Sequence, residues 1–390
     1  MTRLAILGGQ PAFPEGVAFV RPPTPPLDRV VACLAPSYDK GILTNGPLVA
    51  ELERRTAERL GVAEVVAVAS CTAGLMLTLR ALSPDGAVLV PSFTFSAGPH
   101  AVAWNGLPVV FAECDARSYQ LDCADAADRL DGVGVVMATH VAGAPCDVAG
   151  VERMAADAGV PALFDAAHAF GAGRGSQPVG GAGIAEVFSL TPTKPLVAGE
   201  GGLVATNRDE IAAQVRIGRD YGNPGDYDTQ FVGLNARMSE LHAAVALESL
   251  TELDEHLGTR EALARRYLDG LRGIPGIMPQ HVDAGDSSTW KDFTVRISAD
   301  NYGASRDSLV AALRAEGVDT RCYFDPPVHR QRAHAQVPTV DLPVTDRVSA
   351  SVVSLPLYRD LEPVTVDRIT ELLALAHDRA GEIMRAGHDD

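Results

Sequence analysis

The chain has 390 residues, of which 46% are hydrophobic and 21% are charged. This composition predicts a globular protein of two or three domains and excludes a disordered or collagen-like chain. Acidic side chains outnumber basic ones by 50 to 33, giving a net charge of −17. That charge argues against a nucleic-acid or anionic-membrane partner, because both are negatively charged themselves.

No apolar run approaches the roughly 18 residues that a membrane span needs. The apolar run at the N-terminus is too short for the core of a signal peptide. The six cysteines include no CxxC pair, and in a chain this long they predict reduced thiols and a cytoplasmic location. The ten histidines show no HExxH or HxH spacing, so we predict no protein-built metal site.

Short apolar runs alternate with helical stretches from about residue 45 to 205. In chain order, the strand candidates are 65–69, 87–90, 107–111, 133–139, 161–164, 186–190 and 203–206. Strands that are apolar on both faces and separated by helices are typical of a parallel sheet covered on both sides. We therefore predict an α/β fold with a mainly parallel seven-stranded sheet.

The pattern changes in the last third of the chain. A helix is expected over 239–257, a Gly- and Pro-containing loop over 275–288, a strand over 289–297, and helices over 305–316 and 366–385. We predict a large domain over 1–250, which includes an N-terminal arm over 1–25, and a smaller α+β domain over 251–390.

Polar residues follow several predicted strands, at the edge where open α/β sheets bind ligands. The segment Ser70-Cys71-Thr72-Ala73-Gly74 precedes a helix, and free backbone N–H groups at a helix start can hold a phosphate. An ordinary Ser N-cap explains the same residues. By itself, this segment favours the capping interpretation.

Two further strand ends carry groups that can ionise. Asp165 and His168 follow one strand, and Lys194 follows another, between prolines and a glycine-rich stretch. Each has a simple structural explanation: a helix N-cap for the aspartate, a half-buried histidine, and a surface lysine. Desolvation would instead lower the pKa of Lys194 and make its amine available for a Schiff base.

Together these segments match what pyridoxal phosphate requires. Lys194 would bond to the cofactor aldehyde, and Asp165 would keep the pyridine nitrogen protonated so that the ring accepts electrons. Phe95 would stack on the ring. There is no GxGxxG after the first strand and no P-loop, which are the signatures of other phosphate-containing cofactors.

These motifs resemble those of the DegT/DnrJ/EryC1/StrS sugar aminotransferases, which are fold-type-I pyridoxal-phosphate enzymes. The resemblance extends over nearly the whole chain. The matching stretches are 8–11, 41–47, 70–75, 91–95, 165–171, 193–194, 199–202, 233–244 and 323–329.

The resemblance implies roles for individual residues. Lys194 looks like the Schiff-base lysine and proton shuttle, Asp165 like the partner of the pyridine nitrogen, and His168 like the contact of the ring oxygen. Thr72, Ala73 and Ser189 match phosphate-binding positions. Asn235 matches a phosphate ligand from the neighbouring subunit, which implies a homodimer with shared active sites.

The resemblance also implies an activity. Amino transfer from L-glutamate to a nucleotide-linked keto sugar is expected, with a dTDP-4-keto-6-deoxyhexose aminated at C4, in antibiotic or surface-sugar biosynthesis. C3 and inosose aminotransferases of the family remain alternatives. Arg219, Tyr221 and His329 are candidate substrate contacts, and a solvated loop explains each of them equally well. A catalytically silent pyridoxal-phosphate-binding module and a cofactor-free carbohydrate-binding protein also remain open.

Overall fold

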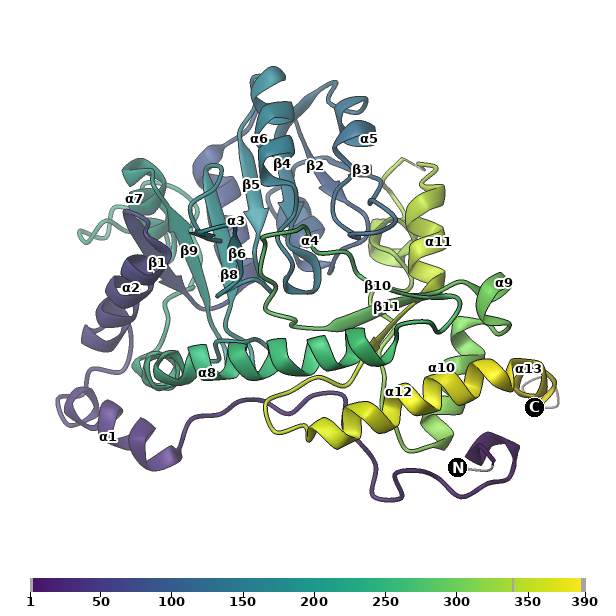
Figure 1. Ribbon diagram of the computed structural model, residues 1–390. Coiled ribbons are helices and arrows are strands. Elements are labelled where there is room, and N and C mark those ends of the chain that lie inside the picture. The colour runs from purple at the N-terminus through teal and green to yellow at the C-terminus, as the bar shows by residue number, and fades with distance from the viewer. Residues whose placement is uncertain (1–2, 339, 387–390) are drawn as a thin grey trace.

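The computed structural model describes residues 3–338 and 340–386 (Figure 1). The helices are α1 (Leu27–Tyr38), α2 (Pro47–Leu60), α3 (Cys71–Leu82), α4 (Ala97–Trp104), α5 (Cys123–Ala127), α6 (Val148–Asp157), α7 (Asp209–Gly218), α8 (Glu240–Gly270), α9 (Ala299–Tyr302), α10 (Arg306–Ala315), α11 (Pro343–Ser351), α12 (Pro363–Asp378) and α13 (Ala380–Ala386). The strands are β1 (Glu64–Val68), β2 (Ala87–Pro91), β3 (Val109–Ala112), β4 (Val133–Thr139), β5 (Ala162–Asp165), β6 (Gly173–Arg174), β7 (Gln177–Pro178), β8 (Ala185–Ser189), β9 (Gly202–Thr206), β10 (Ile277–Pro279), β11 (Phe293–Ile297) and β12 (Val352–Leu355).

The main sheet has seven strands in the order β1-β9-β8-β5-β4-β2-β3. The pairs β2–β3, β2–β4, β4–β5 and β5–β8 are parallel. Strand β9 runs antiparallel to both of its neighbours, β1 and β8. The predicted α/β class and the mainly parallel seven-stranded sheet are confirmed. All seven strand candidates correspond to strands of this sheet.

Helices cover both faces of this sheet, as Figure 1 shows. Alternate residues of a strand point to opposite faces. In β1, Val66 and Val68 face a core that also contains Leu75 of α3, whereas Val65 and Ala67 face a core that contains Leu247 of α8. Burial on both faces explains why the strands are apolar at consecutive positions.

Helix α8 connects this sheet to the C-terminal part of the chain. It extends over 31 residues, well beyond the predicted 239–257, because its buried positions continue from one core into the next. Leu250 belongs to the core of the main sheet, while Leu263 and Tyr267 belong to the core of the C-terminal part. The predicted boundary at 250/251 falls inside this helix, and the division into two domains stays a prediction.

The C-terminal part is built on the antiparallel sheet β10-β11-β12. The N-terminal arm packs here, since Leu4 and Val17 are buried in the same core as residues of α10 and α12. The arm is also tied by its backbone: Ala5 N–H and Ala12 N–H donate to the two carboxylate oxygens of Glu316, at 2.6 and 2.7 Å. Both ends of the chain therefore stabilise one core.

Two predicted elements of the C-terminal part differ from the structure. The expected helix over 366–385 is two helices, α12 and α13, which are separated at Arg379. This break lets Ala380 and Ile383 of α13 turn into the core. The expected strand over 289–297 begins only at Phe293, because residues 289–292 form part of the wall of a cavity described below.

A buried carboxylate fixes the start of α8 against the N-terminal helices. Glu240 accepts hydrogen bonds from the Ser37 hydroxyl and from the backbone N–H groups of Gly46, Leu48 and Val49, at 2.8–3.0 Å. Three of these donors are the N–H groups that a helix leaves unpaired at its first turn, here that of α2. The contact therefore replaces a side-chain N-cap, which Gly46 cannot provide.

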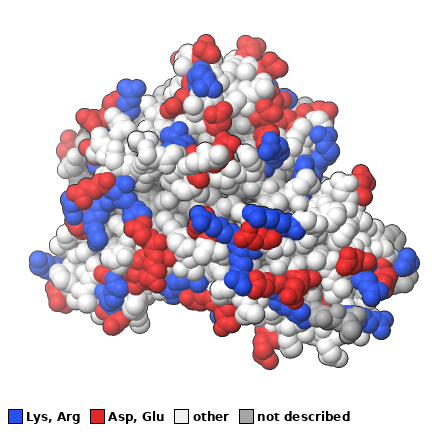
Figure 2. Space-filling model, in the orientation of Figure 1, with Lys and Arg blue, Asp and Glu red and all other residues white. Residues whose placement is uncertain are grey.

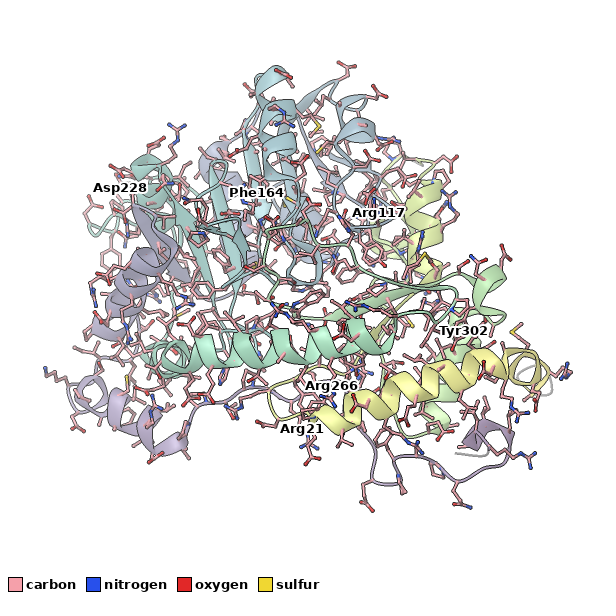
Figure 3. The ribbon with its side chains drawn as sticks, viewed as in Figure 1. Arg21, Arg117, Phe164, Asp228, Arg266 and Tyr302 are labelled. Atoms are coloured by element: carbon pink, nitrogen blue, oxygen red, sulfur yellow. The ribbon has the colours of Figure 1, made fainter. Side chains whose placement is uncertain are left out.

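Acidic and basic side chains are interspersed on the surface that Figure 2 shows. Many form ion pairs, such as Arg266 with Asp367 at 2.5 Å, which joins α8 to α12 (Figure 3). All six cysteines are free thiols. Within residues 3–338 and 340–386, no helix is both long and apolar enough to cross a bilayer, and no group of three metal-ligating side chains converges.

Candidate active site

The carboxyl ends of the parallel strands surround a cavity of about 330 Å³. We call it the central cavity. Its lining includes side chains that follow β1, β2, β4, β5 and β8, together with residues from the C-terminal part. The lining residues are Ser70, Cys71, Thr72, Thr94, Phe95, Ala97, Thr139, Val141, Asp165, Ala167, His168, Ser189, Thr191, Thr193, Lys194, Glu200, Lys291, Asp292, Tyr323 and Phe324.

One end of the central cavity is the N-terminus of α3. Ser70 is the N-cap, and its hydroxyl accepts the N–H of Ala73 at 3.1 Å. The other N–H groups of the first turn lack partners in the helix, and the helix dipole favours an anion there. The N-cap interpretation and the phosphate-binding interpretation of this segment are therefore compatible: Ser70 caps the helix, and the rest of the turn can receive a phosphate.

Gly202 of β9 contributes to this end by its lack of a side chain. A Cβ at this position would lie 2.6 Å from the Cys71 nitrogen and 2.6 Å from the Ser70 carbonyl carbon. Gly202 therefore allows β9 to approach the start of α3.

Asp165 lies at the end of β5 and is 3% exposed. Its Oδ1 accepts the N–H of Ala167 at 3.0 Å and lies 3.8 Å from the Cys71 sulfur. No described residue forms a hydrogen bond with its Oδ2. Burial raises the pKa of Asp165, while the Ala167 N–H and the Lys194 charge oppose that shift. A cation arriving in the cavity would be a natural partner for this carboxylate.

Lys194 follows β8 in a tightly folded loop, in which its backbone N–H donates to the Thr191 carbonyl at 3.0 Å. Burial, and then the nearby Lys291 charge, lower the pKa of Lys194 to about 8. The side chain is half-buried, and its amine has no hydrogen-bond partner among the described residues. It can act as a nucleophile near neutral pH, because a substantial fraction of it is uncharged there.

His168, Ser189 and Phe95 complete the predicted set in the central cavity. Burial, together with the Lys194 and Lys291 charges, lowers the pKa of His168, so its ring is neutral. Its Nδ1 is buried without a partner among the described residues. The Ser189 hydroxyl lies 3.3 Å from that of Thr191. Phe95 is exposed beside the cavity.

The structure places the other candidates outside the central cavity. The Arg219 guanidinium is buried against Glu53 and the Ala67 carbonyl, at 2.5 and 2.6 Å. The His329 Nδ1 lies 2.6 Å from the Ser92 hydroxyl. Both side chains are occupied by contacts within the fold, so their proposed contact with substrate has no geometric support in this chain.

Three more candidates are not among the lining residues. Ala73 follows the lining residue Thr72, and its N–H donates to the Ser70 hydroxyl. Tyr221 is 51% exposed and stacks under Arg237. Asn235 lies on the same loop and pairs with Asp220 in a β-bridge. A role for Asn235 in a neighbouring subunit is consistent with that position and stays a prediction.

Sequence reasoning missed the wall that the C-terminal part contributes. Lys291 and Asp292 lie there as a buried ion pair, with the Nζ 2.6 Å from the Asp292 Oδ1. Tyr323 and Phe324 lie beside them. One signal was present: Lys291 is one of only three lysines in the chain. It was overlooked because residues 289–292 were assigned to a strand.

Comparison with known proteins assigns the chain to a family. The sequence model of the DegT/DnrJ/EryC1/StrS aminotransferase family matches residues 29–374. The chain belongs to this family. The UDP-N-acetyl-3-dehydro-α-D-glucosamine 3-aminotransferase of Acidithiobacillus ferrooxidans is 31% identical over 350 residues, which are 89% of this chain and 93% of that protein.

Solved structures of the DegT/DnrJ/EryC1/StrS type share the whole fold. DesI, solved in the presence of its TDP-sugar product, superposes with a TM-score of 0.93 and 35% identity over 99% of both chains. Streptomyces venezuelae DesV, solved with a ketimine intermediate, gives a TM-score of 0.85 and 31% identity over 92% of this chain and 99% of that chain. The chain is therefore a pyridoxal-phosphate-dependent sugar aminotransferase, and the predicted family and cofactor are confirmed.

The residues of the central cavity fit this cofactor. The α3 N-terminus suits a phosphate, Asp165 Oδ2 suits a protonated pyridine nitrogen, and the unpaired His168 Nδ1 suits the ring oxygen. The amine of Lys194 suits an aldehyde carbon. These assignments of individual residues stay predictions, and a pH experiment tests the one for Lys194.

Loading of the cofactor-free enzyme with pyridoxal phosphate should become faster as the pH rises, with a midpoint near 8. A lysine of pKa about 8 is roughly one quarter uncharged at pH 7.5, against roughly one part in a thousand for an ordinary lysine. Visible absorbance measures the loading rate. The same reaction with a free lysine derivative, measured at each pH, corrects for the ionisation of pyridoxal phosphate itself. A midpoint above about 10 would show that the Lys194 amine is not desolvated.

Proposed function

We propose that the chain transfers an amino group from L-glutamate to C4 of a dTDP-linked 4-keto-6-deoxyhexose. The observation that carries amino transfer is the juxtaposition of Lys194 and Asp165 in one buried cavity of about 330 Å³. The likeness to DesI over 99% of both chains supports a TDP-linked sugar. Amination at C4 is the expectation from the sequence resemblance.

Pyridoxal phosphate, when bound, supplies an aldehyde that exchanges amines and a ring that accepts electrons. The residues of this chain supply the rest. The start of α3 would hold the phosphate, and Asp165 would hold a proton at the ring nitrogen. The Lys194 amine would move a proton to or from the reacting substrate carbon.

Desolvation of the Lys194 amine makes this proton transfer feasible. An amine with a pKa of about 8 can both take and give a proton near neutral pH, which is the best match for a group that must act in each direction. An ordinary exposed lysine would remain protonated and could not act as a base.

The exposed apolar residues support a homodimer. Leu27, Val31 and Tyr38 of α1 are exposed, and so are Tyr227 and Val232 on the loop that leads to Asn235. Large exposed apolar side chains of this kind are often covered by a partner. A second copy that covers this loop would bring Asn235 toward the other active site. Sedimentation should then show a dimer at micromolar concentration, and a monomer would contradict this part of the proposal.

The second candidate is amination at C3 of a UDP-linked sugar, which the Acidithiobacillus relative favours at 31% identity. The reverse reaction separates the two. The holoenzyme is incubated with 2-oxoglutarate and a panel of nucleotide-linked amino sugars, and the L-glutamate formed is measured. We expect the dTDP-4-amino-4,6-dideoxyhexoses to react fastest. Preference for a UDP-3-amino sugar would establish the second candidate, and no reaction with any of them would refute both.

A further inference from the structure

The central cavity contains a second lysine, which is buried. Lys291 is 7% exposed and lies on the C-terminal wall, directly before β11. The chain has 33 basic residues, of which only Lys40, Lys194 and Lys291 are lysines. Two of the three lysines therefore line one cavity, whereas Lys40 is exposed and every other basic residue is arginine.

Carboxylates outnumber cations in the central cavity. Its lining contains the carboxylates of Asp165, Glu200 and Asp292. Lys194 and Lys291 are the only cationic side chains among the described lining residues, since the His168 ring is neutral. Lys194 is assigned to the cofactor aldehyde. An amino-acid donor brings one or two carboxylates, and burying them beside three protein carboxylates requires a cation.

Lys291 has hydrogen-bonding capacity to spare. An ammonium group has three donors, and Asp292 Oδ1 accepts one of them at 2.6 Å. No other described residue forms a hydrogen bond with the Nζ, which lies 6.0 Å from the centre of the Tyr323 ring. Asp292 thus holds the ammonium in position and leaves donors for a ligand.

The backbone of Lys291 is fixed to the wall of the main sheet. Thr289 donates its N–H to the Gly143 carbonyl at 3.1 Å and its hydroxyl to the His168 carbonyl at 2.7 Å. The fit is tight, because a Cβ at Gly143 would lie 2.1 Å from the Thr289 hydroxyl and 3.1 Å from the Lys291 nitrogen. Lys291 is therefore held at a fixed position relative to His168, which faces the same cavity.

We propose that Lys291 binds a carboxylate of the amino donor and that Asp292 positions the Lys291 ammonium for this contact. The inference rests on the proposed function in so far as the donor is an amino acid. The proposal adds a donor-binding residue to the wall that the C-terminal part contributes. The positive charge of Lys291 is opposite to that of the donor carboxylate.

Lys291→Met removes the charge and keeps the length of the side chain. We expect the concentration of L-glutamate that half-saturates conversion of the holoenzyme, followed by loss of its visible absorbance, to rise about 10- to 100-fold, as for loss of a charge-assisted hydrogen bond. Affinity for glutarate, which has two carboxylates and no amine, should fall by a similar factor in calorimetry. Lys291→Arg should recover much of both affinities, and Lys40→Met should change neither.

The remaining readouts distinguish other roles of Lys291. The affinity for pyridoxal phosphate and the concentration of keto sugar that half-saturates the aminated enzyme should be the same in Lys291→Met as in the wild type. The pH dependence of the rates and of the spectrum is expected to shift, because the Lys291 charge lowers the pKa of Lys194. A changed cofactor affinity would assign Lys291 to the cofactor, and weakening confined to the keto sugar would assign it to the acceptor; either result overturns the inference. Failure of the wild type to use L-glutamate would refute the proposed function instead, and glutarate binding would still test Lys291.

Discussion

Lys194→Ala is expected to reduce turnover by at least about 10²–10⁴-fold, which is the usual contribution of a positioned acid–base group. The substitution removes the amine that bonds to the cofactor aldehyde and the group that moves the proton. Each half-reaction can be followed separately by visible absorbance, with L-glutamate and with a keto sugar. Both should slow, because the same amine serves both.

The small number of lysines makes a covalent test possible as well. Borohydride reduction of the wild-type holoenzyme should fix the cofactor on Lys194 and leave Lys40 and Lys291 unmodified, as peptide mass spectrometry would show. Thermal unfolding of Lys194→Ala should occur at the same or a higher temperature, since burial disfavours the charged amine that it removes. Normal turnover by Lys194→Ala, or cofactor fixed on Lys291, would refute the mechanism.

Asp165→Asn is expected to slow both half-reactions by about 10²–10³-fold, the typical effect of losing one preorganised electrostatic contact. The amide has nearly the same shape as the carboxylate and can still accept the Ala167 N–H, but it carries no charge to hold a proton at the ring nitrogen. Single-turnover rates measured at a saturating cofactor concentration separate this effect from weaker cofactor binding.

Cys71→Ala is the matched control for Asp165→Asn. Its sulfur lies 3.8 Å from the Asp165 Oδ1, and burial keeps the pKa of this thiol well above its usual value, so the thiol is uncharged. We expect Cys71→Ala to leave the rates within a few-fold of the wild type. Equal losses in both variants would mean that packing around Asp165, rather than its charge, supports the reaction.

The sequence was sufficient to predict the sheet and the residues at the strand ends. Apolar runs such as 65–69, separated by helical stretches, indicate strands that are buried on both faces. Asp165 and Ser189 end such runs and Lys194 lies one loop beyond, so their convergence at one edge follows from parallel pairing. At the strand ends of the main sheet, the local sequence pattern and the tertiary structure agree.

The remainder of the site depends on contacts that no local pattern encodes. Lys291 reaches the cavity because residues 289–292 pack against the loop at Gly143, roughly 150 positions earlier in the chain. Nothing in the sequence around Arg219 shows that it pairs with Glu53, and its expected contact with substrate stays a prediction. The length of α8 was underestimated for a similar reason: its second half is buried by a different core.

The attachment of the N-terminal arm has a consequence for synthesis and for engineering. Glu316 is separated by 311 positions from Ala5, whose N–H it accepts. The arm therefore leaves the ribosome long before its partner exists, and contacts of such long sequence separation form slowly. Shortened versions that start near Leu27 would remove Leu4 and Val17 from the core that contains Leu313 and Val318. The apolar surface uncovered in this way favours self-association during expression, although every group assigned to chemistry would still be present.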